Sequence, residues 1–315
     1  MADGGCGDRI VREEKISNRT GGKIFGNGGT KVKRIALIND LSGLGKCSLT
    51  AAIPVISAMG LQACPLPTAV LSAQTGFEGY YFDDYTDRMN RITDHWDKME
   101  MSFDGIASGY LGNARQIENL QYFLEKFHGT NTIFLADPVL GDNGKLIKSF
   151  SQELLQTMRE LTKKADVITP NLTELCLLVG ADYAALFAHS ADEDYLSRIA
   201  ETARKLFGGA ERLQIIIVTG IVTRKAEGEY IGNLVVTALD DRYSYFETAY
   251  NGRSFSGTGD LFASVVIGGL VKGQSAANTV QLAMKFLQPA IEDAMRENVP
   301  RDHGVCFEKY LKFLI

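Results

Sequence analysis

Several common features are missing from this 315-residue sequence, and each absence excludes a class of protein. No basic stripe occurs, and the formal net charge of -5 argues against a nucleic-acid-binding protein. No apolar run reaches the roughly 18 residues that a membrane span needs, so we expect no membrane partner. The five cysteines are scattered and odd in number, and none of them forms a C-x-x-C pair. The sequence therefore predicts neither a disulfide framework nor a zinc site. The N-terminus also lacks the charged-then-apolar order of a secretory signal, so we expect a cytoplasmic protein with reduced thiols.

The composition that remains is typical of a globular protein, with 45% hydrophobic and 23% charged residues. Residues 1–31 are glycine-rich and polar and show no sustained periodicity. We interpret them as a flexible leader. The remainder, 32–315, is predicted to form a single domain.

From Lys33 onward, short apolar runs alternate with longer amphipathic ones. Buried strands are predicted at "RIALIN", "LQACPL", "DGIASG", "TIFLAD", "ADVITP" and "LQIIIVTG". Helices are predicted at "CSLTAAIPVISAMG", "ARQIENLQYFLEKFHG", "SQELLQTMRELTKKA" and "DYLSRIAETARKLFGG", with three more helical segments after Gly257. This alternation predicts an α/β fold with a central, mostly parallel sheet flanked by helices. Two alternating segments within 229–249 predict a small antiparallel hairpin.

The residues that end these strands are repeatedly small or polar. Ligands of open α/β sheets bind outside the carboxyl ends of the strands, although turns and helix caps use the same residue types. Asp137 and Asp142 share one short loop, and Asn171 and Glu174 share one helical turn. Paired oxygen ligands of this kind suit a hydrated Mg²⁺ that bridges phosphates.

Near the C-terminal end, the stretch "SGTGD" leads into a long apolar segment. Gly257 and Gly259 allow a sharp bend and a close approach to a ligand, and the first turn of a helix binds anions. Asp260 would face such an anion. The competing interpretation is that Thr258 or Asp260 is an ordinary N-cap beside a tight turn.

Taken together, these motifs resemble the ribokinase-like superfamily and, within it, the pyridoxal/pyridoxamine kinases. The resemblance covers the chain from about Val32 to Ile315. It rests on "INDLSGLGKCSLTAAIPVISAMG", "AVLSAQTGF", "DPVLGDNGKL", "ITPNLTE", "VTG" and "SGTGD", which follow in family order. No G-x-x-x-x-G-K-[ST] motif occurs, so a Walker-type kinase is excluded.

The resemblance implies an ATP-dependent kinase that phosphorylates the 5′-hydroxymethyl group of a B6 vitamer. Asp260 would be the general base, and the backbone N–H groups of Gly257, Thr258, Gly259 and Asp260 would form an anion hole. The implied cofactors are ATP and Mg²⁺, with a requirement for K⁺ left open. The implied metal-binding residues are Asp137, Asp142 and Glu174, with Asn171 beside them. The implied nucleotide-binding residues are Thr169, Asn171, Thr219 and Gly220, and the hairpin would flank the adenine. The implied substrate-binding residues are Asn39, Ser42, Thr75 and Tyr110.

The sequence also departs from the family pattern. Asn39 stands where many pyridoxal kinases have serine, and Gln74 replaces a histidine of the "S-N-H-T-G" segment. Both positions belong to the implied substrate pocket, so the choice of vitamer stays open. The nearest alternative is a hydroxymethylpyrimidine or hydroxymethylpyrimidine-phosphate kinase, in which cysteine usually replaces Asp260. A non-catalytic B6-binding protein is the alternative from another class. Relatives of this kind commonly form homodimers, and the apolar stretches after Pro54 and Pro65 are candidates for an interface or for core.

Overall fold

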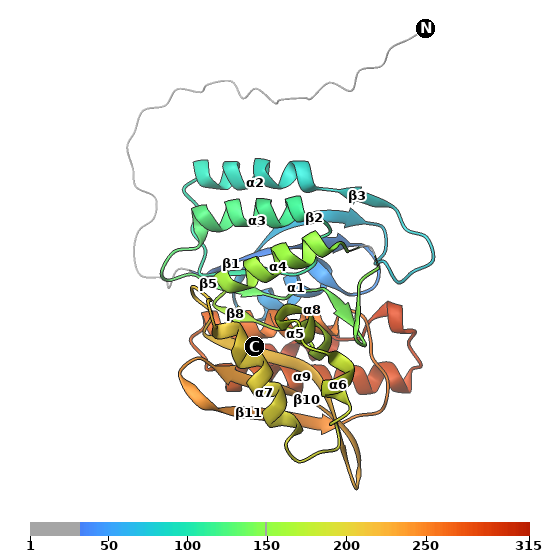
Figure 1. Ribbon diagram of the computed structural model, residues 1–315. Coiled ribbons are helices and arrows are strands. Elements are labelled where there is room, and N and C mark those ends of the chain that lie inside the picture. The colour runs from blue at the N-terminus through green and yellow to red at the C-terminus, as the bar shows by residue number, and fades with distance from the viewer. Residues whose placement is uncertain (1–31, 149) are drawn as a thin grey trace, which may run out of the picture. The chain divides into compact units, whose positions relative to one another are not determined.

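The apolar runs of the sequence form a nine-stranded mixed sheet in the computed structural model, which describes residues 32–148 and 150–315 (Figure 1). The strand order is β11-β10-β9-β8-β5-β4-β1-β2-β3, and the pairs from β9 to β2 are parallel. Antiparallel strands complete both edges. The strands are β1 (Arg34–Ser42), β2 (Gln62–Leu71), β3 (Phe82–Asp84), β4 (Gly105–Ser108), β5 (Ile133–Ala136), β8 (Val167–Ile168), β9 (Ile215–Lys225), β10 (Gly228–Thr237) and β11 (Asp240–Ala249). A separate two-stranded ribbon pairs β6 (Gly141–Asp142) with β7 (Lys145–Leu146).

Helices cover both faces of the sheet, because alternate residues of each parallel strand point into separate apolar cores. In β1, for example, Ala36 and Ile38 face one core, and Ile35 and Leu37 face the other. The first core packs against α2 (Thr86–Lys98), α3 (Ala114–Phe127), α4 (Gln152–Lys164), α5 (Leu172–Val179), α6 (Tyr183–Phe187) and α7 (Tyr195–Arg204). The second packs against α1 (Ser48–Ala58), α8 (Thr258–Val271) and α9 (Ala276–Arg296). The α/β class expected from the sequence is confirmed.

Helix α8 is apolar on every side, which is typical of a helix with no solvent-facing surface. All of its residues from Leu261 to Val271 are buried, and the helix contacts β4, α1 and α9. The "SGTGD" stretch therefore opens onto a helix that is fixed by packing over its whole length. This places Asp260 at a rigid position near the carboxyl ends of the strands.

Local patterns predicted most of these elements. The predicted strands correspond to β1, β2, β4, β5, β8 and β9, and the predicted hairpin is β10–β11. The hairpin continues the main sheet through β9. The sequence did not indicate α2 or β3. The last of the three C-terminal segments is a 3₁₀ helix, Glu308–Leu314, after a shorter one at Arg301–His303.

Two prolines lie inside β2, where a fully paired strand would exclude them. Pro65 and Pro67 pair with Leu37 and Asn39 of β1 on one side. On the other side, β3 pairs only with Ala69–Leu71. The first half of β2 thus has an open edge within the described residues, and the missing N–H groups of the prolines cost no ladder bonds there.

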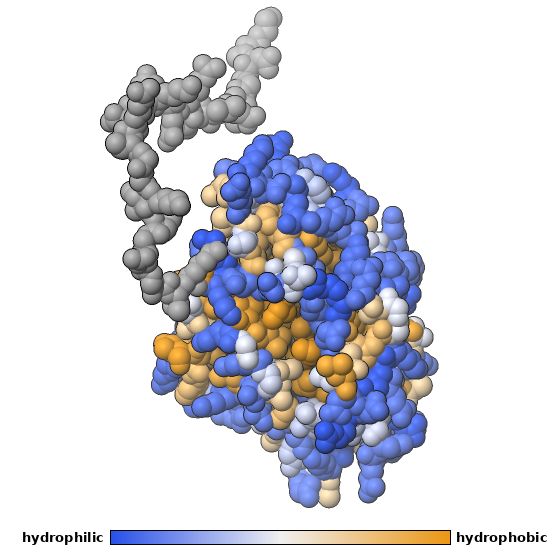
Figure 2. Space-filling model, turned by 90° about the vertical axis from the view of Figure 1, so that its left-hand side faces the viewer, coloured by the Kyte–Doolittle hydropathy of each residue, from blue (hydrophilic) through white to orange (hydrophobic). Residues whose placement is uncertain are grey.

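On the face drawn in Figure 2, apolar residues gather near the middle and polar residues surround them. The stretches proposed for a dimer interface are partly core and partly surface, since Ala58, Pro67 and Val70 are partly exposed. Val55 and Ile56 after Pro54, and Leu66 after Pro65, are buried in the cores of this chain. The homodimer stays a prediction, as does the domain boundary at residue 31, because residues 1–31 lie outside the described part.

Within the described residues, none of the helices combines the length and the apolar character needed to cross a membrane.

Candidate active site

A cleft of about 520 Å³ lies at the carboxyl ends of the strands and collects most of the residues that the sequence singled out. It is lined by the predicted catalytic, nucleotide-binding and metal-binding residues, namely Gly257, Thr258, Gly259, Asp260, Thr169, Asn171, Thr219, Gly220, Asp137, Asp142 and Glu174. The four predicted substrate-binding residues do not line this cleft. The residues predicted to bind the nucleotide and the metal and to catalyse the transfer therefore lie together in space, as the sequence predicted.

The glycine-rich loop bends sharply as it enters α8. Gly257 is the N-cap and has a φ of 81°, in the left-handed region that favours glycine. A Cβ atom there would lie 2.2 Å from the carbonyl oxygen of Lys46, so no other residue fits without movement of the loop. Asp260 is the third residue of α8, and no side chain caps this helix. The hydroxyl of Thr258 donates to the carbonyl of Phe255 instead. The N-cap interpretation of Thr258 and Asp260 is therefore wrong, and the first N–H groups of α8 are not satisfied by a cap.

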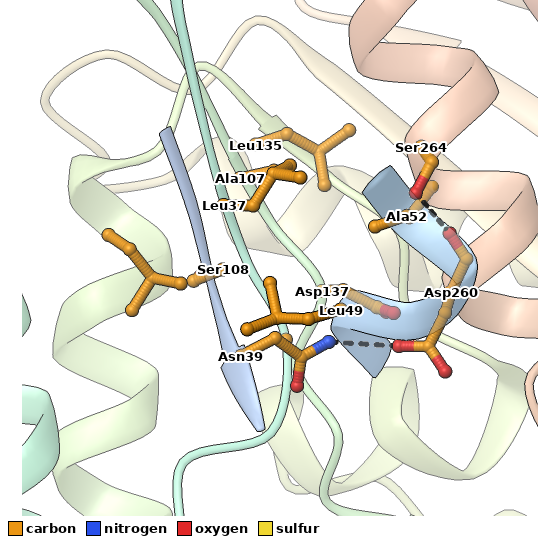
Figure 3. A pocket seen from close by; sticks show the side chains of 13 residues that line it. Leu37, Asn39, Leu49, Ala52, Ala107, Ser108, Leu135, Asp137, Asp260 and Ser264 are labelled. Atoms are coloured by element: carbon orange, nitrogen blue, oxygen red, sulfur yellow. Dashed lines mark hydrogen bonds between the residues drawn. The ribbon is translucent and has the colours of Figure 1, made fainter. Parts of the chain in front are cut away.

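The carboxylate of Asp260 is held by two donors from other parts of the chain. The Asn39 side-chain amide donates to it at 3.0 Å, as Figure 3 shows, and the backbone N–H of Ser48 also donates. Behind it lies a cavity of about 30 Å³, lined mainly by apolar side chains such as Leu49, Ala52 and Ala263. Burial in these surroundings raises the pKa of Asp260 to about 6, and the negative charge of Asp40 contributes.

The side chain of Asn39 is held by contacts within the chain, and its predicted contact with a substrate ring stays a prediction. Its side-chain oxygen accepts from the backbone N–H groups of Asp40 at 2.9 Å and Tyr110 at 2.8 Å. Two donors into this oxygen fix the orientation of the amide, so that its nitrogen faces Asp260. Asn39 thus orients the carboxylate of Asp260, a contact that the sequence did not indicate.

The other predicted substrate-binding residues are placed in three different ways. Ser42 is fully buried, and its hydroxyl donates to Asp40 at 2.7 Å, so it presents no group to a ligand. Tyr110 is partly buried and stacks on Phe150, with ring centroids 6.0 Å apart. Thr75 is exposed in the loop after β2. The structure brings Asn39 and Tyr110 together through one hydrogen bond and leaves Ser42 and Thr75 apart from them.

Of the three predicted metal-binding acids, the partly buried Asp137 and the buried Glu174 lie near each other, whereas Asp142 is exposed. Burial raises the pKa of Asp137, and the neighbouring charge of Asp260 adds to the effect. Burial likewise raises the pKa of Glu174, with a contribution from Asp137. Asp142 is exposed and accepts hydrogen bonds from Asn143. Within the described residues, no three His, Cys, Asp or Glu side chains gather into a ready-made metal cluster.

Glu174 and Asn171 also have a visible structural role. They form a capping box at the start of α5, in which each side chain accepts from the backbone N–H of the other residue. The second Glu174 oxygen accepts from Leu140, and the Asn171 amide donates to Gly141. These contacts fix the loop that carries Asp142 next to α5.

The remaining predicted residues lie beside this loop. The hydroxyl of Thr169 donates to Asp137 at 3.1 Å. Thr219 forms a β-bridge with Asn171, and Gly220 follows it with a φ of 66°. The outer wall of the cleft combines the hairpin with α9 and includes Ile231, Asn233, Thr248, Met284, Leu287 and Ile291. Arg301 is the one basic residue among the described residues that line the cleft, and no local sequence pattern pointed to it.

Comparison with known proteins agrees with this geometry. Residues 45–305 match the family described as phosphomethylpyrimidine kinase. A Caenorhabditis elegans protein named as a pyridoxal kinase is 30% identical over 170 residues, which are 53% of this chain and 48% of that protein. The chain thus matches about half the length of that relative.

Two solved structures are similar over most of their length. One is a Bacteroides thetaiotaomicron protein named as a phosphomethylpyrimidine kinase and crystallised with pyridoxal, with 39% identity and a TM-score of 0.82 over 90% of this chain and 96% of that one. The other is the pyridoxal kinase of Lactobacillus plantarum, with 28% identity and a TM-score of 0.77 over 90% of this chain and 97% of that one. The resemblance to ribokinase-like kinases of the pyridoxal kinase type is confirmed. The chain belongs to the phosphomethylpyrimidine kinase family of ATP-dependent kinases.

Proposed function

We propose that this protein transfers the γ-phosphoryl group of ATP to the 5′-hydroxymethyl group of pyridoxal, pyridoxine or pyridoxamine. The observation that carries the proposal is the position of Asp260. Its carboxylate is held by Asn39 and Ser48 at the start of a buried helix and lines the large cleft. A carboxylate oriented in this way can accept the proton of an alcohol as the alcohol attacks a phosphoryl group.

The first turn of α8 would stabilise the transferred group. Gly257 provides no side-chain cap for the start of α8, and Thr258, Gly259 and Asp260 of its first turn line the cleft. Backbone N–H groups at the start of a helix neutralise charge that develops on phosphoryl oxygens, and positioning plus charge neutralisation is most of what phosphoryl transfer requires. Thr169, Asn171, Thr219 and Gly220 would line the nucleotide phosphates, and the apolar outer wall suits a purine ring.

The acidic residues fit a magnesium ion that arrives with the nucleotide. Asp137 and Glu174 are two carboxylates in a site that disfavours their charge, and a cation would offset that cost. Mg²⁺ commonly binds one or two carboxylates and completes its shell with water and phosphate, so a preformed cluster of three acids is not needed. We propose that Asp137 and Glu174 hold the ion, partly through water, and that Asp142 contributes from the loop. The bound ion would neutralise charge on the phosphates.

For the acceptor, Tyr110 offers an aromatic face that suits a flat heteroaromatic ring, and its backbone N–H contacts Asn39, which holds Asp260. The family name favours a second candidate, in which hydroxymethylpyrimidine or its phosphate is the acceptor. Asp260 occupies the position where cysteine is usual in those enzymes, and the Bacteroides relative was solved with pyridoxal. These two observations favour the B6 vitamers.

The test is a side-by-side comparison of kcat/KM for the three B6 vitamers and hydroxymethylpyrimidine at saturating Mg-ATP, with ATP consumption measured in parallel. We expect at least one vitamer to exceed the pyrimidine about tenfold or more, because a buried hydrogen bond matched to one ring is left unpaired with the other. A higher kcat/KM for the pyrimidine would reassign the acceptor and leave the kinase chemistry intact. No ATP consumption with any of the four acceptors would support the non-catalytic alternative. The cytoplasmic location and the homodimer remain predictions.

A further inference from the structure

Asp40 is a buried carboxylate that the proposed reaction does not use directly. It is 6% exposed and lies where the pairing of β1 with β2 shifts, since Asn39 pairs with Pro67 and Leu41 with Val70. Irregular pairing of this kind re-aims side chains and is frequent beside active sites. The two oxygens of Asp40 accept hydrogen bonds from the hydroxyls of Ser42 at 2.7 Å and Ser48 at 2.6 Å.

Ser48 connects Asp40 with Asp260. Its hydroxyl donates to Asp40, and its backbone N–H donates to the carboxylate of Asp260. Ser48 has a φ of 51°, and Lys46 two residues earlier has the same φ. Positive φ values cost free energy for residues other than glycine, so other contacts must hold this turn in place.

The same turn supports the glycine-rich loop. The carbonyl of Lys46 lies so close to Gly257 that a Cβ atom there would be 2.2 Å away. The N-cap of α1, Cys47, makes no side-chain capping bond, so no cap fixes the start of this helix. Two side-chain hydrogen bonds hold this turn: the hydroxyl of Ser48 donates to the buried Asp40, and the hydroxyl of Thr50 donates to the carbonyl of Cys47 at 2.7 Å. The bond to Asp40 is the one that connects the turn with β1, next to Asp260.

We infer that Asp40 is a positioning residue for phosphoryl transfer, acting through Ser48 to hold the carboxylate of Asp260 toward the acceptor. The inference rests on the proposed role of Asp260 as general base. It predicts a loss of turnover without a loss of nucleotide binding, because Asp40 does not line the nucleotide cleft.

The experiment is a double-mutant cycle measured by steady-state kinetics with Mg-ATP and the best acceptor. Asp40→Ala is expected to lower kcat about ten- to a hundredfold, because a hydrogen bond to a charged group contributes a free energy that corresponds to that ratio of rates. The KM for ATP should change less than about twofold. In an Asp260→Asn background, the same substitution should lower kcat less than about twofold further, since the base on which it acts is gone. Asp40→Asn should recover most of kcat, because an amide oxygen still accepts from Ser48.

Asp166→Ala is the matched control. Asp166 is also a hydrogen-bonded, partly buried carboxylate, which contacts His128, Arg212 and Phe134 at the amino end of β8, opposite the site. This control should lower Tm but change kcat less than about twofold. If Asp40→Ala fails to fold, Ser48→Ala removes the same connection and should show the same pattern.

Three results would overturn the inference: an undiminished loss in the Asp260→Asn background, an equal loss in the Asp166→Ala control, or no rescue by Asp40→Asn. Parental turnover in Asp260→Asn alone would instead refute the proposed base, so the two failures can be told apart.

Discussion

The most direct test of the site is the substitution Asp260→Asn, because the structure shows what it keeps. The Asn39 amide donates to Oδ1 of the carboxylate, and the oxygen of an amide side chain can accept the same hydrogen bond. The amide nitrogen would then point into the cleft, where it cannot accept a proton. The turn at Gly257 and the backbone N–H groups of α8 would be unchanged.

The expected loss can be worked out from these contacts. General-base catalysis contributes about 10²- to 10⁴-fold, so kcat should fall by that factor. This corresponds to roughly 3–5.5 kcal/mol of barrier at about 1.4 kcal/mol per tenfold change. Affinity for Mg-ATP should change little, because the donors to the phosphates are backbone groups.

The assay measures kcat by coupled ADP detection, the dissociation constant of the nucleotide by calorimetry, and Tm in parallel. Burial and the charge of Asp40 raise the pKa of Asp260, so its ionised form destabilises the fold. Removal of that charge should leave Tm equal or higher, and a loss of rate could not then be assigned to unfolding. Turnover within a few-fold of the parent would refute the role of Asp260.

Two further predictions concern charge at the same site. Glu174→Gln keeps one acceptor oxygen for the capping box with Asn171 but removes the charge and the acceptor for Leu140, so the Mg²⁺ concentration for half-maximal rate should rise severalfold with a modest loss of Tm. Glu174→Ala should lower Tm more, and an unchanged Mg²⁺ titration of the Gln variant would assign Glu174 to capping alone. The second prediction concerns pH. Asp260 must be ionised to act as a base, and its pKa is raised to about 6, so kcat/KM should fall as the pH drops through about 6. If kcat/KM fell only near pH 4, as for an ordinary carboxylate, the result would contradict the buried environment.

The sequence predicted those parts of the fold and site that are encoded locally. Unbroken apolar runs mark the parallel strands, and the glycines around Asp260 mark the start of α8. By contrast, β3 has only three residues, too few for a periodic pattern. Helix α2 is mostly polar and charged, and Met89, Ile92 and Trp96 are its only large apolar residues, although they follow helical spacing.

The missed contacts in the site are long-range ones. Asn39 and Asp260 are 221 residues apart in sequence, and only the assembled fold, in which α8 packs against β4 and α1, brings them together. The same holds for Ser42, whose position in a predicted ligand loop gave no sign that its hydroxyl would be buried against Asp40. Residue type and motif order therefore indicate which residues gather at a site, whereas the direction in which an amide or hydroxyl points depends on the assembled core.

The prolines of β2 have a consequence for how this chain behaves before it is fully folded. A sheet edge with free N–H and C=O groups is a template on which a strand from another molecule can add, and this is a common route to aggregation. Between Gln62 and Pro67 the outer edge of β2 is uncovered by β3. Pro65 and Pro67 offer no N–H group to an incoming strand, so a second chain cannot extend the sheet there with a continuous ladder. The order of the strands leaves this edge of β2 open, and we expect the two prolines to hinder other chains from pairing with it during synthesis and refolding.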